Sequence, residues 1–333
     1  KYGVKRFRGL IDGTLDYNER WIRSRIRELP EGSWSFEDQL DDDAHVPGPV
    51  PLKVKLTIRH KPQAHMVFDF AGSSAQRTGG VNCVYEALFA TVAYALKATL
   101  DPELWSNAAF ERVVKIEAPL GSIVNPLPPA PVGGRGTTCQ RLADLLLGAL
   151  SKVIAGRVTA CGHGTTSINL HGHDPIRGRR FICIDGLGGG MGGREGHDGM
   201  DAVQINTNNI PNLPTEVLES EYPIRVERYE LVPDSGGAGE FREETDSGGR
   251  PVFGTAAVLV LDAHLGGHPE RGVGARALEP VRVHTQALGP RVAEAGGHGK
   301  DGVASRNRAG RGLDLLGDGA PALRGHARVR GVF

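Results

Sequence analysis

Residues 53–70 read KVKLTIRHKPQAHMVFDF, with apolar and polar side chains in alternation on both sides of a short break at residues 61–63. The apolar positions are Val54, Leu56, Ile58, Met66, Phe68 and Phe70. Successive side chains of a strand point to opposite faces, so this pattern predicts a β-hairpin with one buried face. The sequence therefore places a sheet with a single packed face at the centre of its first third.

Helical patterns flank the hairpin. Residues 84–100 are apolar on nearly every side, which predicts a covered helix, and residues 138–153 carry an apolar stripe at helical spacing with Thr138 as the expected N-cap. An earlier apolar stripe at residues 15–29 predicts a first helix that ends at Pro30. Further strands are expected at 167–170, 181–185 and 225–231.

The alternation of these patterns predicts a mixed α/β (α+β) fold. We expect twisted, largely mixed sheets with packed helices, joined by long Gly/Pro-rich loops such as residues 124–136.

Composition narrows the class of protein. The formal net charge of +0 gives no reason to expect nucleic acid as a partner, and no apolar run approaches the roughly 20 residues of a membrane span. The first residues lack the basic-then-apolar order of a signal peptide, so the cytoplasm is the expected location. The four cysteines are far apart in sequence and lack a C-x-x-C pair, which favours buried free thiols over a zinc ribbon or a disulfide framework.

The last part of the chain has a different composition. After Arg242 there is no Tyr, Trp, Ile or Met, and Gly, Ala, Arg, Val, Pro and His dominate. Large apolar side chains supply most core area, so this segment can bury little. We therefore divide the chain into residues 1–242 and a tail of residues 243–333, which we interpret as disordered or as the product of a translated frameshift.

A first polar constellation follows the predicted strand at residues 66–70. The run DFAGSSAQRTGGVN, residues 69–82, delivers an acid and two hydroxyls into a glycine-rich turn before a helix. Backbone amides at a helix start favour an anion or a developing oxyanion. The alternative is a turn whose polar side chains cap the backbone. The residues concerned are Asp69, Ser73, Ser74, Gln76 and Asn82.

A second constellation spans residues 162–174. It contains His163, Thr165 and Thr166, followed by Asn169, His171, His173 and Asp174. His171 and His173 fall on one side of the predicted strand, where two imidazoles and a carboxylate can bind Zn or Mn. The alternative is that these histidines are solvated side chains in a loop.

A third constellation is the glycine-rich run of residues 188–201, which includes Gly189 and Gly190. It lacks the strand-turn-helix context of a dinucleotide fingerprint and the Gly-Lys-Ser/Thr of a P-loop, so it does not predict nucleotide binding. His197 beside Asp198 predicts a general acid/base pair or a metal site, with an exposed charged turn as the alternative. Residues 206–209 add polar side chains that can line a cleft.

Several long motifs, in the same order, resemble the hydantoinase B/oxoprolinase family. They are DFAGSSAQRTGGVN (69–82), EAPLGSIVNPLPPAPVGGRGTTCQRLADLLLGAL (117–150), GLGGGMGGREGHDG (186–199) and NIPNLPTEVLESEYPIRVERYELVPDSGGAGEFR (209–242). The resemblance covers about residues 1–242. It implies a hetero-oligomer in which an A-type subunit uses ATP and this chain supplies part of the site where a small cyclic amide, such as a hydantoin or a lactam, is opened.

The resemblance also implies the site. It points to His197, Asp198 and Asp69 as catalytic residues, and to Ser73, Ser74, Gln76, Asn82, Arg135, Gln140, Arg141, Gly189 and Gly190 as substrate-binding residues. It implies a divalent metal (Mn, Zn or Mg) bound mainly by a His/Asp-rich motif that lies upstream of Tyr2 in the family, so no metal ligand is assigned in this chain. Two alternatives stay open: a component of an acetone carboxylase-type enzyme, and a non-catalytic fragment or assembly module.

Overall fold

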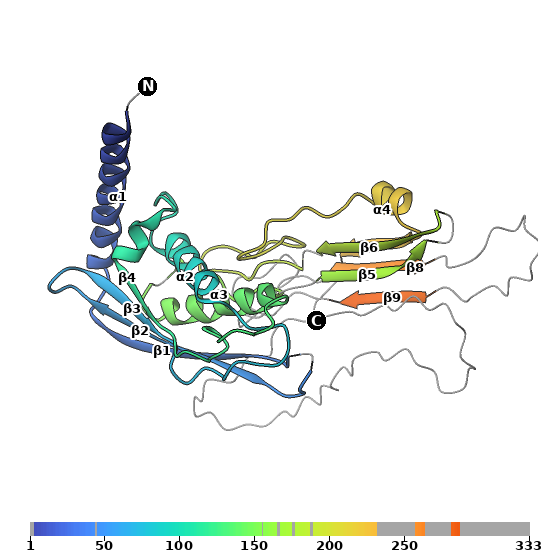
Figure 1. Ribbon diagram of the computed structural model, residues 1–333, viewed down its shortest axis with the longest axis horizontal. Helices are drawn as coiled ribbons and strands as arrows, with labels where there is room; N and C mark the ends of the chain where they lie inside the picture. Colours follow the sequence, from blue (N-terminus) through green and yellow to red (C-terminus); the bar gives the residue numbers. More distant parts are fainter. Residues whose placement is uncertain are drawn as a thin grey trace, which may run out of the picture.

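The computed structural model describes residues 3–43, 45–154, 156–164, 167–174, 177–186, 189–231, 257–263 and 281–286. Within them the chain forms an α+β fold with one four-stranded sheet, one two-stranded sheet and one three-stranded sheet (Figure 1). The described helices are α1 (Val4–Arg27), α2 (Tyr85–Leu100), η1 (Ala108–Arg112), α3 (Arg135–Ser151) and α4 (Thr215–Glu221). The described strands are β1 (Gly32–Leu40), β2 (Val50–Arg59), β3 (His65–Asp69), β4 (Val114–Glu117), β5 (Ser167–Asp174), β6 (Arg179–Gly186), β7 (Arg225–Leu231), β8 (Ala257–Ala263) and β9 (Val281–Gln286).

The predicted hairpin is confirmed as β2 and β3. They pair antiparallel with Ile58 opposite Met66 and Lys55 opposite Asp69, and they form the centre of the sheet β1-β2-β3-β4. β4 joins β3 in parallel, so the sheet is mixed, as expected. The alternate residues of β2 are buried while its charged residues point away, which is the one-sided burial that the alternation indicated.

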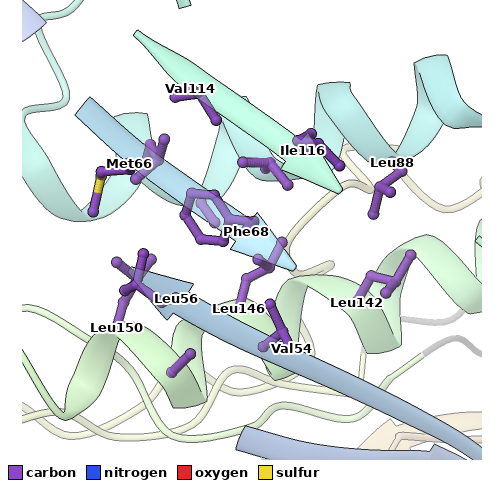
Figure 2. Close-up of a cluster of buried hydrophobic side chains, with 14 of the residues drawn as sticks. Val54, Leu56, Met66, Phe68, Leu88, Val114, Ile116, Leu142, Leu146 and Leu150 are labelled. Carbon is purple, nitrogen blue, oxygen red and sulfur yellow. The ribbon is translucent and has the colours of Figure 1, made fainter. Parts of the chain in front are cut away.

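Helix α3 lies against the inward face of β1 and β2, and α2 packs beside it (Figure 1). Figure 2 shows Leu142, Leu146 and Leu150 of α3 facing the sheet, where Phe68 is fully buried. Burying a side chain of this size stabilises the fold by about 1.5–3 kcal/mol, so this layer supplies much of the core. The packing fixes the orientation of α3 and hence the position of its polar residues.

Two helix ends differ from prediction. α1 begins at Val4, well before the apolar stripe that predicted it. α3 begins at Arg135 with Gly134 as its N-cap, so the prediction that Thr138 caps this helix is wrong. The Thr138 hydroxyl instead donates a hydrogen bond to the carbonyl of Val81 from inside the helix, because the loop before α2 runs past this turn.

The two remaining sheets contain the later predicted strands. β5 pairs with β6, and β7 pairs antiparallel with β8, which pairs with β9. Within the range 243–333 the structure describes only β8 and β9, and Arg242 also falls outside the described residues. The division of the chain at residue 242 therefore stays a prediction. Among the described helices, none is both long and apolar enough to cross a membrane.

Candidate functional site

The polar side chains of α3 converge on a buried cluster. Arg141 and Asp144 are three residues apart and therefore share a face of the helix. The Asp144 side chain is 2% exposed and the Arg141 side chain 11%. A carboxylate buried this deeply in a leucine-rich helix is rare unless it is paired with a cation. The Arg141–Asp144 pair is therefore a candidate functional feature.

Arg141 lies between two carboxylates. Its Nη1 is 3.2 Å from Asp38 Oδ2 and 3.5 Å from Asp144 Oδ2. Asp38 reaches this point because it follows Trp34 and Phe36 on the inward-facing positions of β1. One guanidinium thus joins the end of β1 to the middle of α3.

Only one oxygen of the Asp144 carboxyl group accepts a hydrogen bond from the described residues. Its Oδ1 accepts a hydrogen bond of 3.0 Å from Asn206 Nδ2, whereas its buried Oδ2 accepts none from the described residues. Burial raises the pKa of this carboxyl to about 6, although the charge of Arg141 and the Asn206 hydrogen bond act in the opposite direction. Asp144 therefore keeps its proton to a higher pH than an ordinary aspartate.

The loop around Asn206 is held to α3 by a second residue. Gln140 Nε2 donates to the carbonyl of Ile205 at 3.0 Å, and the amide of Thr207 donates to Gln140 Oε1 at 3.4 Å. Asn206 itself has φ of 50°, in the left-handed region that few non-glycine residues adopt. Such a conformation persists where surrounding contacts enforce it, here those of Gln140 and Asp144.

A thiol completes this group. The pKa of Cys161 is raised to about 12 by burial and then by the negative charge of Asp144. A thiol in this state is not a nucleophile near neutral pH, because the thiolate is the reactive form. We call Asp38, Gln140, Arg141, Asp144, Cys161 and Asn206 the α3 polar cluster.

The glycine-rich run packs against the segment that carries Cys161. A Cβ on Gly192 would lie 2.5 Å from the carbonyl oxygen of Ala160, and a Cβ on Gly162 would lie 2.9 Å from that of Gly190. These backbones approach closely only because both positions lack a side chain. Gly189 and Gly190 are buried, and Gly188 is outside the described residues.

His163 lies at the same junction. Its backbone amide donates to the carbonyl of Gly190, its Nδ1 is 3.2 Å from the same oxygen, and its buried Nε2 has no hydrogen-bond partner among the described residues. Burial lowers the pKa of His163 and so favours the neutral imidazole. Thr165 and Thr166 fall outside the described residues, as do the side chains of His171 and His173.

The predicted pair His197–Asp198 lies elsewhere, on an exposed turn. Arg194 and His197 exchange backbone hydrogen bonds of 2.9 Å across a tight hairpin, with Gly196 at φ of 76°. Both the His197 and the Asp198 side chains are exposed. The structure therefore does not bring this pair into the α3 polar cluster, and its catalytic role stays a prediction.

The constellation after β3 is held mainly by local hydrogen bonds. Asp69 Oδ1 accepts from the amide of Ala71 at 2.8 Å, which is an Asx turn. Ser73 Oγ accepts from the amide of Lys53 and donates to its carbonyl, closing the edge of β2. Ser74 Oγ donates to the neighbouring carbonyl of Ala75 at 3.1 Å.

Gln76 and Asn82 tie the same turn to the loop before α3. The Gln76 carboxamide pairs with both backbone groups of Leu127. Asn82 is fully buried, and its side chain bonds backbone atoms of Arg77, Gly79 and Pro131. These contacts match the capping alternative, and a substrate-binding role for the constellation stays a prediction.

Arg135, the first residue of α3, is exposed at the surface. Of the predicted substrate-binding residues, Gln140 and Arg141 lie in the α3 polar cluster, and the buried Gly190 contacts His163 beside it. Asp38, Asp144 and Cys161 were not predicted. An acid inside the leucine-rich stripe of residues 142–150 was the available signal for Asp144.

The described residues do not provide a metal site. Nowhere in the described part of the chain are three or more His, Cys, Asp or Glu side chains grouped to hold a metal ion. Asp174, named above with two histidines, binds the amide and the guanidinium of Arg177. The described residues do not fit the divalent metal that the family resemblance implies.

The chain belongs to the Hydantoinase B/oxoprolinase family, whose sequence model matches residues 1–245. The predicted family is thereby confirmed. An uncharacterized protein of Methanocaldococcus jannaschii is 37% identical over 73% of this chain and 41% of that protein. The beta chain of the caprolactamase of Pseudomonas jessenii is 30% identical over 73% of this chain and 42% of that protein.

Solved structures agree with this assignment. The ATP-dependent caprolactamase of Pseudomonas jessenii superposes with a TM-score of 0.66 at 26% identity, covering 78% of this chain and 44% of that chain. The nucleotide-free acetone carboxylase superposes with a TM-score of 0.62 at 16% identity, over 75% of this chain and 34% of that chain, and shows the shared fold alone. The chain spans less than half the length of these relatives.

Proposed function

We propose that this chain forms part of an ATP-dependent hydrolase that opens a small cyclic amide. The observation that carries the proposal is the family match over residues 1–245, together with relatives named for such substrates. One is the caprolactamase beta chain, and another, 31% identical over 73% of this chain, is provisionally named as a component of a D-/L-hydantoinase in a Pseudomonas species.

The proposed chemistry divides the work between two subunits. An amide is a poor electrophile, and transfer of a phosphoryl group from ATP to its oxygen creates a leaving group that water can displace. An A-type partner subunit would carry out this transfer. This chain would bind the activated ring and help to orient the attacking water.

The α3 polar cluster supports a binding role for Arg141. Its Nη1 contacts two carboxylates, while Nη2 faces the backbone of Gly164, where a Cβ would still lie 3.7 Å away. A guanidinium presents several donors in a rigid fork, so the donors not used by Asp38 and Asp144 can bind a carbonyl or phosphate oxygen. In this proposal Asp144 is a positioning residue that orients Arg141.

Catalytic roles for three further residues are also part of the proposal. His197 and Asp198 would serve as acid and base from the exposed hairpin, with Asp69 as a third catalytic group. This arrangement requires the hairpin of residues 191–200 to approach bound substrate.

The test is turnover by the full-length protein containing this chain, purified with its A-type partner. ATP would be supplied with hydantoin, caprolactam or 5-oxoproline in one set of reactions, and with acetone and bicarbonate in another. ADP and a ring-opened acid in the first set support the proposal. Carboxylated ketone would assign the complex to the carboxylase branch, and a stable complex without turnover would indicate an assembly role.

A further inference from the structure

Two of the four cysteines lie side by side in the core. Cys83 Sγ and Cys139 Sγ are 3.7 Å apart, and both cysteines are free thiols. They are 56 residues apart in sequence, so the contact arises because the segment before α2 packs against the first turns of α3. A disulfide requires an S–S distance of about 2.05 Å, so the two sulfurs need only approach by roughly 1.6 Å.

We infer that Cys83 and Cys139 form a redox-active pair that hydrogen peroxide converts to an intramolecular disulfide. The two cysteines differ in access, which sets their order of reaction. Cys139 is 9% exposed and Cys83 is fully buried, so Cys139 meets the oxidant and Cys83 resolves the product.

The pKa shifts of the two thiols agree with this order of reaction. Contact with the Cys83 sulfur lowers the pKa of Cys139, against the effect of burial. The same contact, together with burial, raises the pKa of Cys83 far above its ordinary value. Of the two thiols, Cys139 therefore loses its proton more readily.

The chemistry balances with peroxide as the only co-reactant. The Cys139 thiolate attacks one peroxide oxygen, so an S–O bond forms, the O–O bond breaks and hydroxide leaves, taking up a proton as water. The Cys83 sulfur then attacks the sulfenic sulfur of Cys139, an S–S bond forms, and the hydroxyl group leaves as water with the Cys83 proton. Two thiols and one peroxide become one disulfide and two waters.

The other cysteines provide matched controls inside the same chain. Burial raises the pKa of Cys183 to about 11, and burial followed by the charge of Asp144 raises that of Cys161 to about 12. Neither has a second sulfur in contact among the described residues. Both are therefore expected to react more slowly and to form no internal disulfide.

The experiment is native oxidation of the full chain followed by alkylation, trypsin digestion without reductant and mass spectrometry. Cleavage after Arg and Lys places Cys83 in peptide 78–97 and Cys139 in peptide 136–141. We expect these two peptides as the dominant linked species, lighter than their sum by two hydrogens. Cys183→Ser should leave the linked species unchanged, and Cys83→Ser should abolish it and leave a Cys139 sulfenic acid that dimedone traps.

Three results would overturn the inference: no linked peptide under native conditions, a linked peptide that appears only in urea, or over-oxidation of Cys139 in the wild-type chain. If Cys83→Ser fails to fold, as judged by circular dichroism, the wild-type peptide map alone decides between these outcomes.

Discussion

Asp144 Oδ1 accepts a hydrogen bond of 3.0 Å from Asn206 Nδ2, and this bond connects the buried centre of α3 to a loop more than sixty residues later in the chain. The other oxygen of Asp144 accepts no hydrogen bond from the described residues, so the carboxyl is anchored through one oxygen only. This combination makes Asp144 the most informative position for testing the site.

The first prediction concerns the pH dependence of stability. The pKa of Asp144 is about 6 in the folded chain and 3.8 for an ordinary aspartate, so folding favours the protonated form. Its stabilising contribution is complete below pH 3.8 and is lost as the pH rises through about 6. The loss amounts to about 3 kcal/mol at most.

Asp144→Asn keeps the shape of the side chain and removes its ionisable carboxyl group. Urea unfolding at pH 5.0, 6.0 and 7.5 should show a free energy of unfolding that falls less steeply with pH in Asp144→Asn than in the wild-type chain. Parallel pH profiles for the two chains would contradict a buried, titrating Asp144.

The second prediction concerns the loop that Asn206 belongs to. Gln140→Ala removes both hydrogen bonds to residues 205–207, so their amides should exchange faster with deuterium than in the wild-type chain. Arg135→Ala, on the exposed first turn of the same helix, should leave their exchange unchanged. Equal exchange in both variants would show that α3 does not hold the loop.

The third prediction concerns the glycine-rich run. Gly192→Ala places a Cβ 2.5 Å from the carbonyl oxygen of Ala160 and should destabilise the fold by about 1–3 kcal/mol. Gly13→Ala in α1 meets nothing within 4 Å and should be neutral or stabilising by up to about 1 kcal/mol. Thermal unfolding of both variants checks the difference, and equal melting temperatures would argue against close backbone packing at Gly192.

The fourth prediction separates structural from binding roles after β3. Asn82→Ala leaves backbone groups of Arg77, Gly79 and Pro131 without their partner and should cost about 2–4 kcal/mol of stability. Ser74→Ala removes one local bond from an accessible hydroxyl and should change stability by less than about 0.5 kcal/mol. If chemical denaturation shows only a small change in the free energy of unfolding for Asn82→Ala, a structural role for Asn82 is contradicted.

The sequence was sufficient for the hairpin, because the alternation at residues 54–70 reports which strand face is buried. The helical spacing of apolar residues also predicted which face of α3 is buried. The sequence did not reveal β1, where Trp34 and Phe36 alternate with polar residues as in β2, and no signal in it paired Cys83 with Cys139.

The site was harder to predict than the fold. Glycine and asparagine runs indicated unusual backbone, and Asn206 does adopt a left-handed conformation. The partnership of Asp38 with Arg141 depends on how α3 docks on β1, over a separation of 103 residues. Local sequence cannot report such a contact, since it arises from tertiary packing.

The strongest test of the proposed function is the rate of ATP-dependent ring opening by the assembled enzyme carrying Arg141→Met. The control is Arg112→Met, which removes a surface arginine that pairs with Asp16 and Glu19. If Arg141 binds the activated ring, kcat/KM for the cyclic amide should fall by about 100-fold or more in Arg141→Met, with the assembly intact, and stay close to wild type in Arg112→Met. An intact assembly with wild-type kcat/KM in Arg141→Met would contradict the proposed role of the α3 polar cluster.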